Sequence, residues 1–185
     1  MCGICGAITT NGSRIDETVL RRMTDVMTHR GPDESGVYLR QAPGKSVGLG
    51  HRRLSIIDLS EAGRQPLSNE DGTVWLVFNG EIYNYPELRR ELEGRGHRFR
   101  SNTDSEVIVH LYEDEGEACA RRLAGMFAFA VWDEKTETLV LSRDRIGIKP
   151  LVYRHNGDTF LFASEIRSIL QHPGVERRRD RKSVV

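Results

Sequence analysis

The chain begins MCGICGAIT (residues 1–9), which places a cysteine directly behind the initiator methionine. Ile4–Thr9 is an apolar run typical of a short buried strand, so the first strand starts almost at the amino terminus. If Met1 is removed, Cys2 carries both a thiol and a free α-amine. Because an α-amine has a reference pKa of about 8, it can accept a proton near neutral pH. The segment therefore raises the hypothesis of an amino-terminal nucleophile.

The three cysteines leave other interpretations to weigh. Cys2 and Cys5 form a C-x-x-C, which could be a redox pair or half of a zinc site. A zinc site needs two more ligands, and the remaining Cys119 has no cysteine or histidine near it at ligand spacing. A redox pair usually opens a helix, whereas this pair precedes an apolar strand. Cys5 and Cys119 are better explained as small core residues, and we predict no disulfide framework and a reducing, cytoplasmic location.

Length and charge narrow the class of protein. A chain of 185 residues is long enough for one sizeable domain with a core. Lys and Arg number 27 and Asp and Glu number 27, so a net charge of zero gives no reason to expect a nucleic acid or an anionic membrane surface as partner. No apolar run approaches the roughly 20 residues of a membrane helix, and no secretory leader is visible.

The hydrophobic pattern predicts an α+β protein with helices layered on antiparallel sheets. Asp16 is expected to cap a helix whose apolar positions recur with helical spacing through Met27. Other strands are expected at 36–40, 47–51, 73–79, 126–133, 138–144 and 151–163, the last with an Asn156-Gly157 hairpin turn. Other helices are expected at 86–96, from Asp104, and from Ser164. We predict a domain over 1–175 and a charged tail over 176–185.

Further segments occur in a characteristic order. They are HRGPD (29–33), GHRRLSIIDLS (50–60), FNGEIYNY (78–85), TDSEV (103–107), MFAFAVWD (126–133), SRDRIGIKPL (142–151) and ASEIRSIL (163–170). Together with MCGICG, they resemble the class II glutamine amidotransferase domain, most closely the glutaminase half of glutamine-hydrolysing asparagine synthetases. The resemblance covers nearly the whole chain. It implies a four-layer αββα sandwich of antiparallel sheets, of the amino-terminal-nucleophile hydrolase type.

The resemblance also implies roles for particular residues. Cys2 corresponds to the nucleophile that attacks the side-chain amide of glutamine, giving a γ-glutamyl thioester and ammonia. Asn79 and Gly80 correspond to the oxyanion hole, in which an amide side chain and a backbone N–H donate to the tetrahedral oxygen. A glycine at this position would also let the substrate approach the backbone closely. Taken without the surrounding motif, Asn-Gly is more typical of a turn.

The remaining implied residues bind the substrate. Arg53 corresponds to the arginine that holds the α-carboxylate of glutamine, with Arg52 as its nearby competitor. Asp104 and Glu81 correspond to carboxylates that hold the α-ammonium, although Asp104 could also cap the following helix. The backbone of a loop is expected to line the pocket; its residues are Leu54, Ser55, Ile56 and Ile57. We assign no metal ligand and no histidine to the chemistry, and we expect HRGPD and RDRIGIKP to serve architecture or an interface.

One part of the related synthetases has no counterpart here. Their ATP-using domain carries an S-G-G-x-D-S pyrophosphate loop, which this sequence lacks. ATP and magnesium are therefore implied only for a missing synthetase domain, acting in cis or in trans, and no cofactor for this one. The tail would begin the linker to that domain, and a homodimer stays open. Alternatives are a class II amidotransferase with another ammonia acceptor, or a glutamine-binding module without turnover if Met1 is retained.

Overall fold

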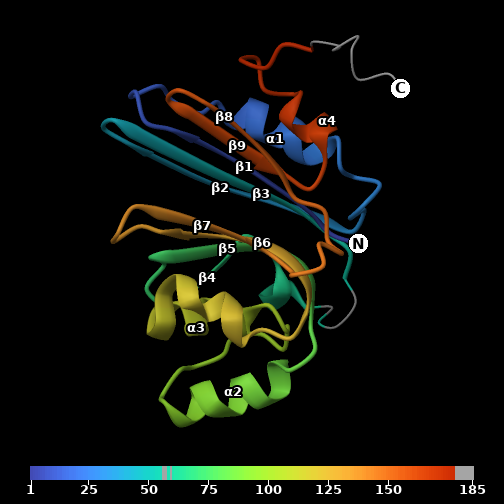
Figure 1. The fold of residues 1–185 in the computed structure, drawn as a ribbon, viewed down its shortest axis with the longest axis vertical. Helices are drawn as coiled ribbons and strands as arrows, with labels where there is room; N and C mark the ends of the chain where they lie inside the picture. Colours follow the sequence, from blue (N-terminus) through green and yellow to red (C-terminus); the bar gives the residue numbers. More distant parts are fainter. Residues whose placement is uncertain (56–57, 59, 178–185) are drawn as a thin grey trace.

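Two antiparallel sheets, stacked face to face, form the centre of the computed structural model, which describes residues 1–55, 58 and 60–177 (Figure 1). The first sheet has the strand order β2-β3-β1-β9-β8 and the second β4-β5-β6-β7. The strands are β1 (Gly3–Thr9), β2 (Glu34–Ala42), β3 (Lys45–Arg53), β4 (Leu67–Ser68), β5 (Val74–Ile82), β6 (Gly125–Asp133), β7 (Thr138–Arg143), β8 (Val152–Asn156) and β9 (Thr159–Ala163).

Helices cover the outer face of each sheet. They are α1 (Glu17–Asp25), α2 (Tyr85–Gly94), α3 (Glu106–Glu115) and α4 (Ile166–Ile169), with 3-10 turns at Glu61–Gly63 and Gly116–Arg122. Helices α1 and α4 lie on the first sheet, and α3, with α2 beyond it, lies under the second (Figure 1). Within the described part of the chain, no helix has the length and apolar character needed to cross a membrane.

Three hydrophobic clusters fill the three spaces between these four layers. The middle cluster joins the sheets and includes Ile4, Leu49 and Trp132. A second cluster joins the first sheet to α1 and α4, and a third joins the second sheet to α2 and α3. The observed order of layers is therefore α, β, β, α, which confirms the predicted αββα sandwich.

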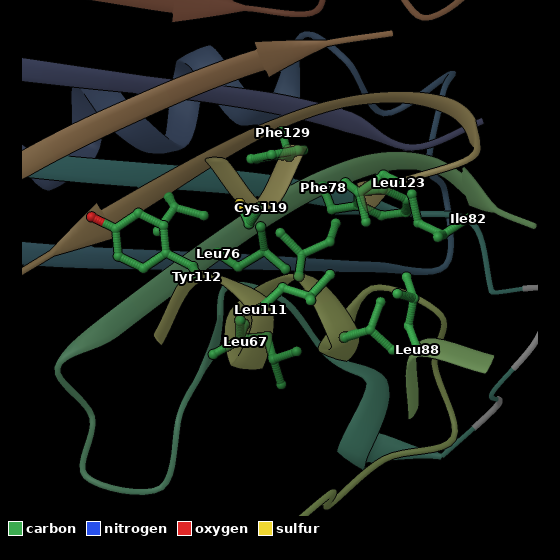
Figure 2. Close-up of a cluster of buried hydrophobic side chains, with 14 of the residues drawn as sticks. Leu67, Leu76, Phe78, Ile82, Leu88, Leu111, Tyr112, Cys119, Leu123 and Phe129 are labelled. Carbon is green, nitrogen blue, oxygen red and sulfur yellow. The ribbon is translucent and has the colours of Figure 1, made fainter. Parts of the chain in front are cut away.

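The alternation of strand residues explains how one sheet serves two cores. Along β5, Val77 faces the first sheet while Leu76 and Phe78 face α3, because successive side chains of a strand point to opposite faces (Figure 2). Strand β6 repeats the pattern with Ala128 inward and Phe129 toward the helices. A strand covered on both faces needs apolar residues at nearly every position, as the sequence of this region shows.

Most predicted elements are confirmed, and some strands, such as β2, are longer than the sequence indicated. Asp16 caps α1 by accepting a hydrogen bond from the Thr18 N–H at 2.7 Å, and β8 and β9 form the hairpin predicted around Asn156-Gly157. Asp104 does not cap α3: Ser105 holds the cap position, and the Asp104 carboxylate instead accepts a hydrogen bond from the Ile82 N–H at 2.8 Å. The carboxylate is thus tied to the end of β5.

Gly6 in the central strand β1 leaves no room for a side chain. A Cβ there would overlap the Phe162 ring of β9 and lie 2.8 Å from the Gly48 carbonyl oxygen of β3. Because the backbone of β3 cannot move without disturbing the sheet, we expect Gly6→Ala to lower the free energy of unfolding by about 1–3 kcal/mol.

Gly94→Ala is the matched control, since no atom lies within 4 Å of a Cβ at this helix end. It should be neutral or stabilising by up to about 1 kcal/mol. Urea denaturation followed by circular dichroism measures both changes, and equal stabilities for the two variants would contradict the packing argument.

Candidate active site

A cavity of about 250 Å³ lies beside the amino terminus. Its walls come from the amino terminus, the end of β3 with the loop after it, the end of β5, the segment before α3 and the loop after β7. The lining residues are Met1, Cys2, Arg53, Leu54, Asp58, Gly63, Gln65, Phe78, Asn79, Gly80, Glu81, Thr103, Asp104, Ser105 and Lys149. The cavity therefore brings together segments from both sheets that are far apart in the sequence.

Cys2 is half-buried at one side of this cavity. Its Sγ accepts a hydrogen bond from the Leu54 N–H at 3.4 Å and lies 3.8 Å from the Leu54 carbonyl oxygen. Burial raises the pKa of the Cys2 thiol, against the opposing effects of the Leu54 N–H and the amino-terminal charge. With Met1 attached, the thiol therefore stays protonated near neutral pH.

The backbone of Cys2 is held by residues of two sequence motifs. Arg30 donates from Nε to the Cys2 carbonyl oxygen at 2.9 Å, and its Nη1 pairs with Glu165 at 3.0 Å. His29 also meets Glu165, at 2.9 Å from Nε2. HRGPD and ASEIRSIL thus meet at the amino terminus and fix where Cys2 points.

Asn79 and Gly80 lie at the end of β5. The Asn79 side chain is 1% exposed, and its Nδ2 has no hydrogen-bond partner among the described residues. Because an unpartnered buried amide is costly, this donor is available to a group bound in the cavity. Position 80 has room only for glycine because the backbone of β6 lies so close: a Cβ there would overlap the Met126 carbonyl oxygen and lie 2.7 Å from the Phe127 Cα.

The peptide that precedes Asn79 is held from both sides. His51 donates from Nε2 to the Phe78 carbonyl oxygen at 3.0 Å, and the Phe78 N–H donates to Gln65 Oε1 at 2.7 Å. Burial lowers the pKa of His51 to about 4, so the ring is neutral at physiological pH. Neither residue is predictable from the sequence, because nothing in the local pattern shows that β3 and β5 meet at this point.

Arg53 is buried at the end of β3. Its Nη1 donates to Glu34 at 2.8 Å and to the Ser60 carbonyl oxygen at 3.1 Å, and its Nη2 donates to the Asp58 carbonyl oxygen. These contacts with described residues use three of the five guanidinium donors. Arg52, the competitor considered above, does not line the cavity and pairs with Asp25 at 3.1 Å.

Asp104 and Glu81 supply the carboxylates of the cavity. Burial raises the pKa of Asp104, and the nearby Glu81 charge adds to this effect against the Ile82 N–H. Among the described residues, no basic side chain forms an ion pair with Asp104. A bound ammonium group would therefore relieve an unbalanced buried charge.

The loop predicted to line the pocket is only partly placed there. Leu54 lines the cavity and contacts Cys2 through its backbone. Ser55 is not among the lining residues, and its N–H donates to Asp33 at 2.8 Å. Ile56 and Ile57 lie outside the described residues.

Lys149 of the SRDRIGIKPL motif lines the cavity, which the sequence analysis did not predict. Asp144 shapes this loop by accepting hydrogen bonds from the N–H groups of Ile148 at 2.9 Å and Lys149 at 3.0 Å. The motif therefore builds architecture, as expected, and also brings the buried Lys149 to the wall of the cavity.

Comparison with known proteins identifies the family. A model of the glutamine amidotransferase domain matches residues 1–185. The chain is 44% identical over 184 residues to asparagine synthetase [glutamine-hydrolyzing] 3 of Bacillus subtilis, covering 98% of this chain and 29% of the relative. It is 43% identical over 180 residues to asparagine synthetase [glutamine-hydrolyzing] 2 of the same organism, covering 96% and 23%. The chain belongs to the glutamine amidotransferase domain family.

A solved structure supports the fold independently. The glutamine phosphoribosylpyrophosphate amidotransferase of B. subtilis, solved with ADP and GMP, aligns with 91% of this chain and 43% of its own at a TM-score of 0.73. The two are 23% identical in sequence, so the comparison shows a shared fold and no more. The chain spans between a fifth and a third of the length of the two curated relatives.

The burial of the cysteines predicts selective and slow alkylation. Burial raises the pKa of Cys5 to about 11 and that of Cys119 to about 12, and both are enclosed, whereas Cys2 borders the cavity. Because only thiolates react, iodoacetamide should modify Cys2 alone, and at pH 8 it should do so more slowly than it modifies free cysteine. The rate of Cys2 modification plotted against pH should have its inflection above pH 8.

Peptide mass spectrometry of Met1-bearing protein across a pH series measures this. Protein unfolded in urea serves as the control and should react at all three cysteines. Faster reaction of Cys2 than of free cysteine at pH 8 would show that its pKa is lowered instead.

Proposed function

We propose that this domain hydrolyses L-glutamine to glutamate and ammonia through a γ-glutamyl thioester on Cys2. The observation that carries the proposal is the composition of one cavity: a thiol, an arginine, a buried amide donor that has no hydrogen-bond partner among the described residues, and a carboxylate that forms no ion pair with a described side chain. Membership of the glutamine amidotransferase family supports the same reaction.

The charges of the cavity match the backbone of a free amino acid. Arg53 would receive the α-carboxylate through its remaining donors, and Asp104, with Glu81, would receive the α-ammonium. Together they would fix the substrate so that its side-chain amide lies toward Cys2. A substrate lacking the α-ammonium would leave the Asp104 carboxylate without an ion-pair partner, and one lacking the α-carboxylate would leave the remaining donors of Arg53 unused, which is the physical basis of selectivity.

The reaction would then proceed in two stages. The sulfur of Cys2 attacks the side-chain carbonyl carbon, and the oxygen that becomes negative receives hydrogen bonds from Asn79 Nδ2 and the Gly80 N–H. The carbon–nitrogen bond breaks, and the nitrogen takes up a proton and leaves as ammonia. Water then attacks the thioester, releasing glutamate and restoring the thiol.

The base in this scheme is the α-amine of Cys2 itself. A buried thiol with a raised pKa needs a proton acceptor, and His51 is a poor one, because burial lowers its pKa to about 4 and it is not among the residues that line the cavity. In Met1-bearing protein the Cys2 nitrogen is an amide, which is not basic, and Met1 also lines the cavity. Removal of Met1 would thus create the base and clear the site.

For the larger enzyme, we propose that the ammonia serves ATP-dependent amidation of aspartate. Support comes from the asparagine synthetases at 43–44% identity, of which this chain spans 23–29%. ATP and magnesium would belong to the remaining acceptor domain, in the same or a separate chain, and no cofactor to this one. A cytoplasmic location would fit the three unpaired cysteines. A different ammonia acceptor is the alternative, and assaying the full enzyme with aspartate and ATP separates the two.

The free amino terminus provides the decisive test. We expect protein beginning at Cys2 to hydrolyse glutamine and protein retaining Met1 to be inactive, because only the former has a basic amine beside the thiol. Intact-mass measurement establishes the terminus, and released ammonia or glutamate reports turnover. Full activity in protein whose mass includes Met1 would exclude the α-amine as base.

Variants at the cysteines complete that experiment. Cys2→Ala should reduce turnover by several orders of magnitude while leaving the thermal stability close to that of the parent. Cys119→Ala, at a buried cysteine outside the cavity, is the control and should keep the turnover of the parent per folded molecule. Substantial turnover in Cys2→Ala would refute the thioester mechanism.

A second prediction concerns recognition of the α-carboxylate. Loss of a charged hydrogen-bond partner costs about 1.5–3 kcal/mol, so Arg53→Ala should raise the KM for glutamine by about 10- to 150-fold. The hydrolysis of 4-aminobutanamide, which lacks the carboxylate, should change much less. Steady-state kinetics with both substrates measures the difference.

Arg52→Ala provides the comparison, since the neighbouring arginine pairs with Asp25 outside the cavity. It should leave the KM for glutamine within a few-fold of the parent value. Equal losses with both substrates in Arg53→Ala would assign that arginine a structural role through Glu34.

A further inference from the structure

A second group of chemically active side chains lies at the junction of α2 and α3, away from the cavity. It consists of His97, which follows α2, and His110 and Glu113 of α3. None of the three lines the cavity beside Cys2. We propose that these residues form a binding site for a divalent transition-metal ion of the zinc class.

The geometry of the three ligand atoms carries the proposal. Glu113 Oε2 lies 2.8 Å from His110 Nδ1 and 3.5 Å from His97 Nδ1, and one ligand atom from each residue lies within 4.8 Å of the others. Ligand atoms of a tetrahedral zinc site with bonds of about 2.0–2.1 Å stand about 3.3 Å apart. Small side-chain adjustments would therefore place all three around one ion.

The other polar atoms of these ligands are already oriented by neighbours. His97 Nε2 meets Asp114 Oδ1 at 3.0 Å, and His110 Nε2 faces Glu106 Oε1 at 3.8 Å. Metal-bound histidines typically present their second nitrogen to a carboxylate, which fixes the ring and strengthens the ligand. This supporting hydrogen bond is present at His97, whereas at His110 the Glu106 carboxylate lies nearby but beyond hydrogen-bond distance.

Glu113 is oriented in the same way. Asn69 donates from Nδ2 to Glu113 Oε1 at 2.8 Å, which leaves Oε2 as the oxygen directed at the histidines. His110 is 1% exposed, and its Nε2 has no hydrogen-bond partner among the described residues. A ring held at Nδ1 by a metal would keep a proton on Nε2 and donate it toward Glu106.

Access and ligand type define the ion. The side chains of His97 and Glu113 are 17% and 25% exposed, so the site is open to solvent on one side, where water would complete the coordination. Two imidazoles and one carboxylate suit zinc and related first-row transition-metal ions, whereas magnesium and calcium prefer oxygen ligands alone. A bound ion would pin the segment after α2 to α3.

A proton competes with the metal for the same ring. Burial by itself lowers the pKa of His110, but the contacts with Glu106 and Glu113 outweigh this effect and raise the pKa to about 9. Metal uptake must displace this proton, so the titration is best performed at pH 8 or above in a buffer that does not bind zinc.

The test is calorimetric titration of the whole chain with zinc sulfate, followed by cobalt(II) absorption spectra. We expect one zinc ion per chain at this site, with a tetrahedral cobalt spectrum. His97→Ala, which removes a partly exposed ligand with little risk to the fold, should weaken this binding at least about 100-fold. Asp114→Asn should weaken it about 10-fold, since it alters only the support of His97.

Two control variants locate the ion. His155→Ala removes an exposed histidine of β8 and should bind zinc like the parent. Cys2→Ala should also retain the site, which separates it from a metal bound to the thiol and from the fate of the hydrolase proposal. Absence of zinc binding by the parent, or unchanged binding by His97→Ala, would overturn the proposal.

Discussion

The pairing of β1 with β3 determines where Cys2 lies relative to the other residues of the cavity. In the antiparallel register, Gly3 lies opposite Arg52, so the next positions in each direction, Cys2 and Arg53–Leu54, meet just beyond the ladder. The other edge of β1 is bonded to β9, which leaves the strand buried in the centre of its sheet. A residue at a chain terminus is ordinarily free to fray, but here the sheet and the Arg30 contact hold it.

The second sheet contributes Asn79, a hydrogen-bond donor of the site, through its own strand register. Strand β5 pairs with β6 along its length and presents Asn79 toward the first sheet, where an apolar residue would otherwise complete the core. The orientation of that side chain depends on the peptide before it, which His51 holds from the facing sheet and Gln65 from the loop before β4. The space between the sheets thus serves as core along most of its length and as a binding site at one end.

Charge balance separates the two polar clusters of the protein. In the cavity, Asp104 is buried with no basic side chain paired to it among the described residues, and Arg53 retains donors after its contacts with described residues. Such incomplete satisfaction costs stability and is typical of a site that gains its partners on binding. Near α2 and α3, the carboxylates instead surround two histidines, one of them buried, which is the arrangement of a cation site.

The sequence by itself determined the elements, because helix caps, turns and apolar periodicity are local properties. Asp16, the Asn156-Gly157 turn and the doubly apolar β5 were all readable from neighbouring residues. The sequence motifs also named Cys2, Arg53, Asn79 and Asp104, all of which line one cavity.

Only the tertiary structure decided which residues far apart along the chain meet. The bond from His51 to Phe78 requires the two sheets to stack in one relative position, and the approach of His97 to His110 requires α2 and α3 to pack side by side. Likewise, the need for glycine at position 80 arises from the closeness of β6, which the local sequence does not encode. Strand register and layer packing are set by the summed burial of many side chains, so no single segment carries that information.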